Sequence, residues 1–482
     1  MTDFNFYLVL PVACLAVFGL WSMLLVPYLR GSNVTQGVVA LIGLGATAAT
    51  LVRLWSEWSM RGPMETASGL VRIDGFGLFF SFVLLAVGAL TVLGSIPFLE
   101  RNDADQGEVY ALILLCLAGM FLMLHTTHLM VVLIGLEVFS LALYVLTGLT
   151  RGRARSVESA LKYFLLGAFS SGFMVYGLAL LYGAVGSLDM VRIGAVAATE
   201  SGPLLWTGMG LLLIGLAFKI GVVPFHQWVP DVYEGAPTNV TGFMAAATKT
   251  VAIAVLLRFL VGAFGDHGDV WIPLIKWLAI FTMTVGNLVA LAQTNLKRML
   301  AFSSIAHAGY LLIAVVSDGG VGAILFYLTS YAVMTVGAFT ILAAVGHGDA
   351  ESERGYELTD WAGLGWSRPM LGVAMTICLL SLAGIPPTGG FLGKYVVFQS
   401  AMRSQQYLLA VVGVLNAAVA AYYYLRVIVR MYMEGDEPDE APLPTSPAMA
   451  AVMILSVVGV LYLGLAPGRL LSLIEGLAGS LI

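Results

Sequence analysis

The stretch Ala217–Ala246, AFKIGVVPFHQWVPDVYEGAPTNVTGFMAA, begins as an apolar run of the kind that crosses a membrane. Lys219 lies inside this run, and Pro224 follows five residues later. Proline removes a backbone donor and clashes with the carbonyl one turn back, so Pro224 should break the helix. Broken backbone at membrane depth persists only where it is buried in protein or lines a wet cavity, and the freed carbonyls should hydrate Lys219. Because a lysine costs about 3 kcal/mol to insert into hydrocarbon, this combination indicates a charge pathway.

The composition is typical of a polytopic membrane protein. Hydrophobic residues make up 59% of the 482 residues and charged residues only 11%, whereas a soluble domain carries about 25% charged residues. The net charge of -5 is small, and neither a basic tract nor a glycine-rich phosphate loop suggests nucleic acid as a partner. Cys14, Cys116 and Cys378 are isolated in apolar runs without metal or disulfide spacing, so we interpret them as small buried hydrophobes.

Apolar runs of spanning length recur from end to end and predict an all-α membrane protein with about fourteen transmembrane helices. The predicted spans are 5–28, 36–55, 75–98, 109–125, 127–149, 159–184, 204–223, 238–263, 271–293, 300–316, 321–345, 370–401, 406–431 and 447–466. Lysine and arginine are most frequent in the loops after odd-numbered spans, above all in the cluster RGRAR at 151–155. By the positive-inside rule these loops face the cytoplasm, so both termini should lie on the outer side of the membrane.

The seventh and twelfth predicted spans are interrupted by proline and lie five helices apart. In the twelfth, Pro386 and Pro387 should break the helix within SLAGIPPTGGFLGKYVVFQ. Broken helices at corresponding positions of two halves are typical of transporters with inverted repeats. The sequence therefore predicts two inverted five-helix repeats, formed by spans four to eight and nine to thirteen. The predicted divisions are N-terminal helices in 1–108, a first repeat in 109–264, a second repeat in 265–433, and an acidic linker with a C-terminal helix in 434–482.

Ionisable residues inside the predicted spans are the candidate functional residues, because such groups are rare in membranes and usually functional. Glu137 lies in the apolar run VVLIGLEVFSLALYVL. Lys162 lies four residues after Glu158, so it forms either an ordinary helix-surface ion pair or the movable partner of Glu137. Lys219 and Lys249 lie deep within or beside their spans, where burial favours the neutral form of a lysine. Such a lysine can bind and release a proton, unlike an arginine.

Glu137, Lys162, Lys219 and Lys249 form the start of a row of ionisable residues along the chain. His307 and Lys394 extend this row into the second predicted repeat. His307 lies among small residues of the tenth span and is either a proton relay or a satisfied helix contact. Lys394 follows the second break. One acid followed by basic groups suits protons that move along water and side chains at the midplane, and it suits a bulky organic solute poorly.

These residues resemble a known family, the antiporter-like membrane subunits of respiratory complex I, NADH:quinone oxidoreductase. The resemblance covers the chain from about span four to span thirteen. Its motifs are PFHQWVPDVYEGAPTNVTGF at 224–243, NLKRMLAFSSIAHAGYLL at 295–312 and LAGIPPTGGFLGK at 382–394. Tyr233, Gly235 and Lys394 make the chain similar to the N-type subunits, the counterparts of mitochondrial NADH dehydrogenase subunit 2, rather than to the L and M types.

The resemblance implies a role for each candidate residue. Glu137 and Lys219 would form a switching pair that Lys162 modulates. Lys249 would be the central relay, and Lys394 the exit-side group, with His307 between them.

The resemblance also implies a subunit of a proton-translocating enzyme in the inner membrane of a bacterial cell. A separate soluble arm would pass electrons from NADH to quinone. Flavin, iron–sulfur clusters and quinone would be bound by other subunits, with no cofactor or metal in this chain. Its membrane neighbours would be the J-, K- and M-type subunits. The alternative is a subunit of a multi-subunit sodium/proton antiporter, which shares this ancestry and would have the same buried lysines.

Overall fold

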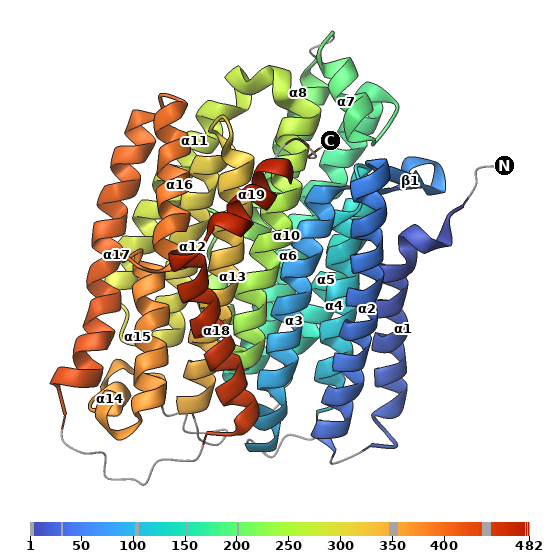
Figure 1. The fold of residues 1–482 in the computed structure, drawn as a ribbon. Coiled ribbons are helices and arrows are strands. Elements are labelled where there is room, and N and C mark those ends of the chain that lie inside the picture. Colours follow the sequence, from blue (N-terminus) through green and yellow to red (C-terminus); the bar gives the residue numbers. More distant parts are fainter. Residues whose placement is uncertain are drawn as a thin grey trace.

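The computed structural model describes residues 4–29, 32–101, 106–150, 152–199, 202–346, 355–435, 445–477, 479 and 481, and these residues are almost entirely helical (Figure 1). The helices are α1 (Phe6–Leu25), α2 (Asn33–Arg61), α3 (Gly75–Arg101), α4 (Glu108–Leu124), α5 (Leu129–Thr147), α6 (Ala154–Val185), α7 (Met190–Ala197), α8 (Pro203–Ile220), α9 (Trp228–Gly235), α10 (Thr238–Phe264), α11 (Gly268–Leu291), α12 (Leu296–Val315), α13 (Gly320–Val345), α14 (Leu364–Ser367), α15 (Pro369–Ala383), α16 (Gly389–Arg403), α17 (Tyr407–Met433), α18 (Pro447–Leu465) and α19 (Gly468–Leu477). Strands β1 (Met64–Thr66) and β2 (Val71–Ile73) form an antiparallel hairpin.

The long helices run side by side in one bundle, with α1 and α2 at one flank and α17 at the opposite flank (Figure 1). The start of α1 lies beside the hairpin, since the Asn5 backbone N–H donates to the Thr66 hydroxyl at 2.8 Å. The C-terminal helix α19 lies towards the same end of the bundle (Figure 1). The hairpin, α7 and α19 are elements that the sequence analysis did not predict.

Eleven apolar helical segments among the described residues are long enough to cross a membrane, and one of them, Thr238–Leu291, contains both α10 and α11. The chain is therefore an all-α, multi-pass membrane protein, as its composition predicted. The count of about fourteen spans and the outward orientation of both termini stay predictions. Arg151 of the basic cluster and residues 436–444 of the acidic linker lie outside the described residues.

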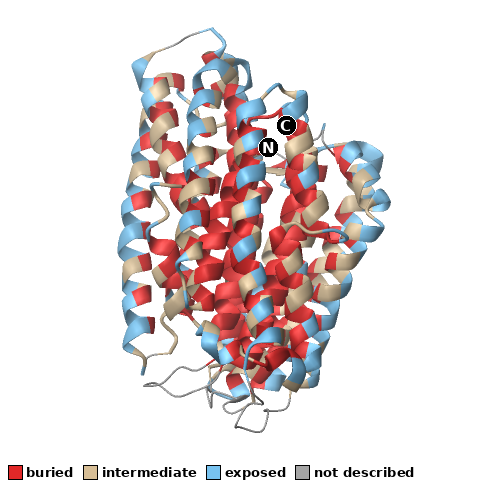
Figure 2. Ribbon diagram, turned by 90° about the vertical axis from the view of Figure 1, so that its left-hand side faces the viewer, coloured by how far each residue is buried: buried red, intermediate tan, exposed pale blue. Residues whose placement is uncertain are grey.

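The core of the bundle consists of α10, α12 and α13, which are buried almost along their whole length. Figure 2 shows the buried residues concentrated in the middle of the bundle and the exposed ones on its outside. A helix that is apolar all round is suited to such a central position. The outer helices expose large apolar side chains instead, among them Phe169 of α6, Phe281 of α11 and Leu415 of α17. This pattern is expected of a surface that faces lipid or other apolar helices.

The seventh span is broken where the sequence predicted. Helix α8 ends at Ile220, Gly221 adopts a left-handed conformation with φ +81°, and α9 begins only at Trp228. Glycine adopts this conformation without the steric cost of a Cβ atom. Pro224 lies in the interval between the two helices.

The twelfth span is broken in the same manner. Helix α15 ends at Ala383, Gly384 adopts φ +85°, and α16 begins at Gly389. Pro386 and Pro387 lie in the interval. Helix α6 packs against α8 and α9, and α13 packs against α15 and α16. The two broken helices therefore have corresponding neighbours, while the repeat boundaries at 109–264 and 265–433 stay predictions.

A buried ion pair, which the sequence analysis missed, joins the N-terminal helices to the core. Asp74, just before α3, accepts two hydrogen bonds from the Arg258 guanidinium of α10, at 2.8 and 2.9 Å. Both side chains are almost completely buried. Two parallel bonds between a guanidinium and a carboxylate fix orientation as well as distance. This pair therefore fixes how α10 sits against α3.

We expect Asp74→Asn to destabilise the protein by roughly 3–5 kcal/mol, because it leaves the Arg258 charge buried without its partner. The measurement is the thermal unfolding midpoint of the purified protein in its native assembly. Asp266→Asn, at an exposed acid, is the matched control and should leave the midpoint almost unchanged. Equal midpoints for the two variants would contradict a structural role for the pair.

Candidate functional site

Four of the predicted residues are brought to the centre of the bundle. Lys219, Lys249, His307 and Lys394 are each at most 4% exposed, and they lie on α8, α10, α12 and α16. The ring of Tyr310 lies beside both His307 and Lys394. The structure thus brings Lys219, Lys249, His307 and Lys394 together from four neighbouring helices.

Lys219 lies in the last turn of α8 and binds side chains of α5. Its Nζ donates to the Ser140 hydroxyl at 2.8 Å and to the Tyr144 hydroxyl at 3.4 Å. Aromatic rings of neighbouring residues surround the ammonium, with centroids 5.3 to 5.7 Å away. Such contacts contribute about 2 kcal/mol each when the cation is desolvated. Lys219 is therefore stabilised by hydroxyls and rings rather than by the carbonyls at the helix break, which corrects the sequence-based expectation.

Glu137 lies one turn before Ser140 on the same helix. Its carboxylate accepts a hydrogen bond from the Ser171 hydroxyl of α6 at 2.5 Å. No ion pair joins Glu137 to Lys219 in the described part of the chain, although Lys219 binds Ser140 one turn along the same helix. Glu137 and Lys219, the predicted switching pair, are therefore not in contact. Each forms a hydrogen bond to a different serine, Glu137 to Ser171 and Lys219 to Ser140.

Lys249 and Lys394 both bind backbone carbonyls that the helix breaks set free. Lys249 Nζ donates to the Ile220 carbonyl at the end of α8, at 3.0 Å. Lys394 Nζ donates to the Leu382 and Ala383 carbonyls at the end of α15, at 2.9 and 2.8 Å. The last carbonyls of a helix have no intrahelical partner and carry partial negative charge. The two breaks therefore form two similar binding sites for an ammonium group.

His307 is enclosed by tyrosines that the sequence analysis did not single out. Its Nδ1 lies 2.7 Å from the Tyr327 hydroxyl of α13, and its Nε2 lies 3.3 Å from the Tyr424 hydroxyl of α17. The ring of Tyr310, also beside His307, faces Lys394 Nζ at 5.0 Å. Both ring nitrogens thus have partners, so the arrangement fits a relay and a satisfied contact alike. Tyrosine is common in membrane helices, and only the tertiary structure brings these three together.

Lys162 forms the helix-surface pair with Glu158 that was one of its two interpretations, and no described contact joins it to Glu137, so its role as a movable partner stays a prediction. Its Nζ binds Glu158 at 2.7 Å and Asp231 of α9 at 2.8 Å. Asp231 also accepts a bond from Arg298 of α12 at 2.9 Å. Burial alone would raise the pKa of Asp231, but the hydrogen bonds from Lys162 and Arg298 outweigh it and lower this pKa.

We call this group the ion cluster, and it lines a polar pocket of about 200 Å³ at the surface. The residues around the pocket are Arg155, Glu158, Ser159, Lys162, Asp231, Glu234, Gly235 and Arg298. The ion cluster connects α9, which follows the first break, to α6 of the first predicted repeat and α12 of the second. Exposed ion pairs contribute about 1 kcal/mol or less each, so its stabilising effect is modest.

No group of three or more histidine, cysteine, aspartate or glutamate side chains among the described residues has the geometry of a metal site. Cys116 and Cys378 are buried and Cys14 is half-buried, and all three are free thiols. The burial of these cysteines agrees with their interpretation as small hydrophobes.

The comparisons with known proteins identify a family. The family model described as NADH:quinone oxidoreductase/Mrp antiporter, TM, matches residues 126–420, which is more than half of the chain. The chain is 41% identical over 476 residues to NADH-quinone oxidoreductase subunit N 2 of Roseiflexus castenholzii, covering 95% of this chain and 94% of that protein.

Solved structures agree with this match. A chain of respiratory complex I from Thermus thermophilus is 38% identical, with a TM-score of 0.81, covering 96% of this chain and 98% of that one. A chain of the Mrp complex from Dietzia sp. is 23% identical, with a TM-score of 0.85, covering 98% of this chain and 97% of that one. The second likeness shows a common fold alone.

The placement of the lysines can be tested by chemical labelling. We expect Lys162→Cys to react rapidly with a membrane-impermeant maleimide, because its side chain is 41% exposed. Lys394→Cys should react much more slowly from either side, since position 394 is buried. Both variants need a background in which the native cysteines are replaced by alanine. Equal rates would contradict the different placement of the two lysines.

Proposed function

Because the chain belongs to the subunit N family of NADH-quinone oxidoreductase, we propose that its buried ionisable residues form the route along which protons cross the membrane. A subunit N chain is an antiporter-like membrane-arm subunit of proton-translocating complex I, and it works within an assembly of other subunits. The sodium/proton antiporter alternative has less support, since the Mrp likeness at 23% identity extends only to the fold.

The binding of Lys249 and Lys394 at the two breaks is the observation that supports this proposal most strongly. Carbonyl dipoles partly replace the hydration of an ammonium. No described carboxylate forms an ion pair with either lysine, so neither proton is held by a strong counter-ion. The balance between the charged and neutral forms of each lysine is therefore sensitive to the charge next to it.

Lys219 and Glu137 start the row. We propose that Lys219 moves between Ser140, where the structure has it, and Glu137, one helical turn away on the same face of α5. When Lys219 pairs with Glu137, it withdraws positive charge from the space next to Lys249. When it returns to Ser140, it repels a proton on Lys249 towards the second repeat. The separate serine partners of Glu137 and Lys219 support such an exchange.

His307 and its tyrosines continue the row. A proton that leaves Lys249 would pass His307, whose nitrogens bind Tyr327 and Tyr424, and reach Lys394 beside Tyr310. Hydroxyl groups both donate and accept, so they can pass protons between a histidine and a lysine.

Lys162 would act on the row indirectly, through the ion cluster. Asp231 lies on α9, directly after the break that ends at Trp228, so the Lys162–Asp231 bond restrains the position of the broken helix. Opening this bond would change how closely α9 holds the end of α8, where Lys219 lies. Lys162 is therefore proposed as a positioning residue.

The setting of the chain in the complex follows from its family. We propose that it lies in the bacterial inner membrane beside J-, K- and M-type subunits, with both termini on the outer side. Flavin, iron–sulfur clusters and quinone would be bound by other subunits. The first repeat would occupy 109–264 and the second 265–433.

Lys219→Ala should lower quinone reductase activity and proton pumping together by roughly tenfold, equivalent to about 1.4 kcal/mol on the rate-limiting barrier. Both are measured in native membranes, with assembly checked on a native gel. Lys276→Ala, at a half-buried lysine of α11 outside the row, is the matched control and should keep both activities. If assembled Lys219→Ala complex kept both activities too, the row would not be the route.

The two interpretations of His307 can be separated by His307→Gln. Glutamine keeps a hydrogen-bonding side chain of similar length, but it does not take up a proton near neutral pH. If His307 relays protons, pumping and turnover should fall roughly tenfold while assembly stays normal. Full activity in an assembled His307→Gln complex would identify His307 as a structural contact. Tyr327→Phe, which removes only one partner, should have the smaller effect.

A further inference from the structure

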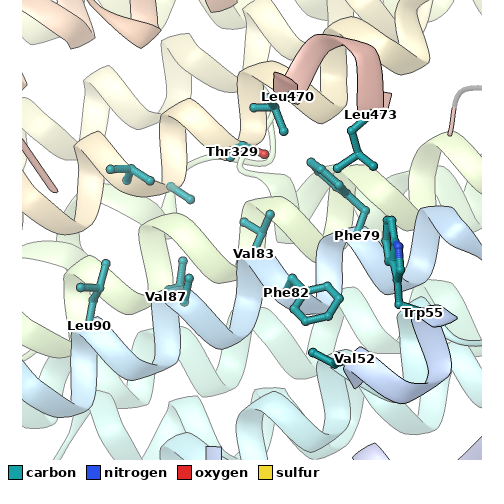
Figure 3. Close-up of a pocket in the computed structure, with 13 residues that line it drawn as sticks. Val52, Trp55, Phe79, Phe82, Val83, Val87, Leu90, Thr329, Leu470 and Leu473 are labelled. Carbon is teal, nitrogen blue, oxygen red and sulfur yellow. The ribbon is translucent and has the colours of Figure 1, made fainter. Parts of the chain in front are cut away.

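An apolar groove of about 530 Å³ lies between α2, α3, α13 and α19, away from the row of ionisable residues (Figure 3). Side chains that define its walls include Val52 and Trp55 of α2, Val83 of α3, Val333 of α13 and Leu470 of α19. Apart from the Trp55 ring nitrogen and one hydroxyl, the lining side chains present only carbon.

The one hydroxyl in the groove is already satisfied. Thr329 donates to the Leu325 carbonyl of its own helix at 2.8 Å. Water in the groove would therefore find almost no hydrogen-bond partner, whereas hydrocarbon would lose nothing by entering. The chemistry of the groove favours an apolar ligand.

The depth of the groove matches one leaflet of a bilayer. Along α3 its lining residues extend from Phe79 to Leu90, which is about 16 Å at 1.5 Å per residue. This is roughly half of the hydrocarbon thickness of about 30 Å. At the hairpin end, Trp55 packs edge to face with Trp58 near the end of α2, and tryptophans of this kind are typical of the membrane–water interface.

We propose that this groove is a binding site for one acyl chain of a phospholipid from the leaflet on the hairpin side. A partner helix would need a groove that continues through the whole bilayer, and it would be about 10 Å wide. This groove instead ends near the midplane. At its outer end the ring of Trp58 and the side chain of Leu477 of α19 both lie beside Gly75, and the tryptophan pair Trp55–Trp58 lies at the depth where a phospholipid begins its head group.

An acyl chain in the groove would support the geometry around His307. Thr329 and Val333 line the groove from α13. On the opposite face of the same helix, Tyr327 lies 2.7 Å from His307 and Tyr331 lies 2.8 Å from the Ser304 hydroxyl. Filling the groove would hold α13 in the position that these contacts require. Only this consequence rests on the proposed function, since the binding site itself does not depend on proton transport.

The test is photolabelling of the intact complex in native membranes with a phospholipid that carries a diazirine on one acyl chain. Wild-type protein should be labelled on peptides of α2, α3 and α13. Ala86→Phe places a ring in the groove from α3, where Ala86 is exposed. Excluding about two methylene groups should reduce this labelling roughly tenfold. Ala418→Phe, at an exposed alanine of α17, is the matched control and should be labelled like the wild type.

Val52→Trp fills the groove from the opposite wall and provides a second test should Ala86→Phe not assemble. Unchanged labelling in an assembled groove-filling variant would overturn the proposal. So would an assembled wild-type complex without label on α2, α3 and α13, since another occupant such as a helix of a neighbouring subunit would then fill the groove. Labelling is scored in the resting complex, so a Lys219→Ala complex should be labelled like the wild type even if it does not pump.

Discussion

The stabilisation of an ammonium group away from water is the constraint on which the centre of this protein depends. A lysine in hydrocarbon needs dipoles around it, and a regular helix offers none because its carbonyls are already used. Each proline-interrupted helix solves this problem by ending at a glycine and leaving its last carbonyls open. Ile220 serves Lys249 in this way, and Leu382 and Ala383 serve Lys394. The breaks are therefore binding sites, and the neighbouring helices are arranged around them.

Two further interactions position the helices around the two breaks relative to the rest of the bundle. The Asp74–Arg258 pair orients α10, the helix that carries Lys249, against the N-terminal helices. The ion cluster connects α9 to both predicted repeats through Asp231. The first is buried and depends on geometry, whereas the second is open to water and easily rearranged. The Asp74–Arg258 pair therefore holds α10 in place, while the ion cluster allows α9 to shift. This combination suits a protein in which a charge moves between fixed helices.

Lys219, Lys249 and Lys394 differ in the groups that stabilise their charge, and these groups affect how easily each lysine can release a proton. Lys219 lies among hydroxyls and aromatic rings, while Lys249 and Lys394 bind carbonyls. All three lack a direct carboxylate partner among the described residues. A strong ion pair would hold a proton in place, while dipoles and rings stabilise a charge and still allow it to leave. The tyrosines around His307, on α12, α13 and α17, extend the same polar environment from His307 to Lys394.

The sequence by itself determined the class of the protein, the two helix breaks and four of the buried ionisable residues, Lys219, Lys249, His307 and Lys394. Composition and proline position act locally, and a lysine in an apolar run is visible without any partner. The tertiary structure decided the contacts: Lys219 binds Ser140 instead of freed carbonyls, Lys162 binds Asp231 in addition to Glu158, and tyrosines lie beside His307. It also revealed Asp74 and Arg258, which are far apart in the chain and look like ordinary interfacial charges. These contacts join helices distant in sequence, and their geometry depends on packing that local patterns do not encode.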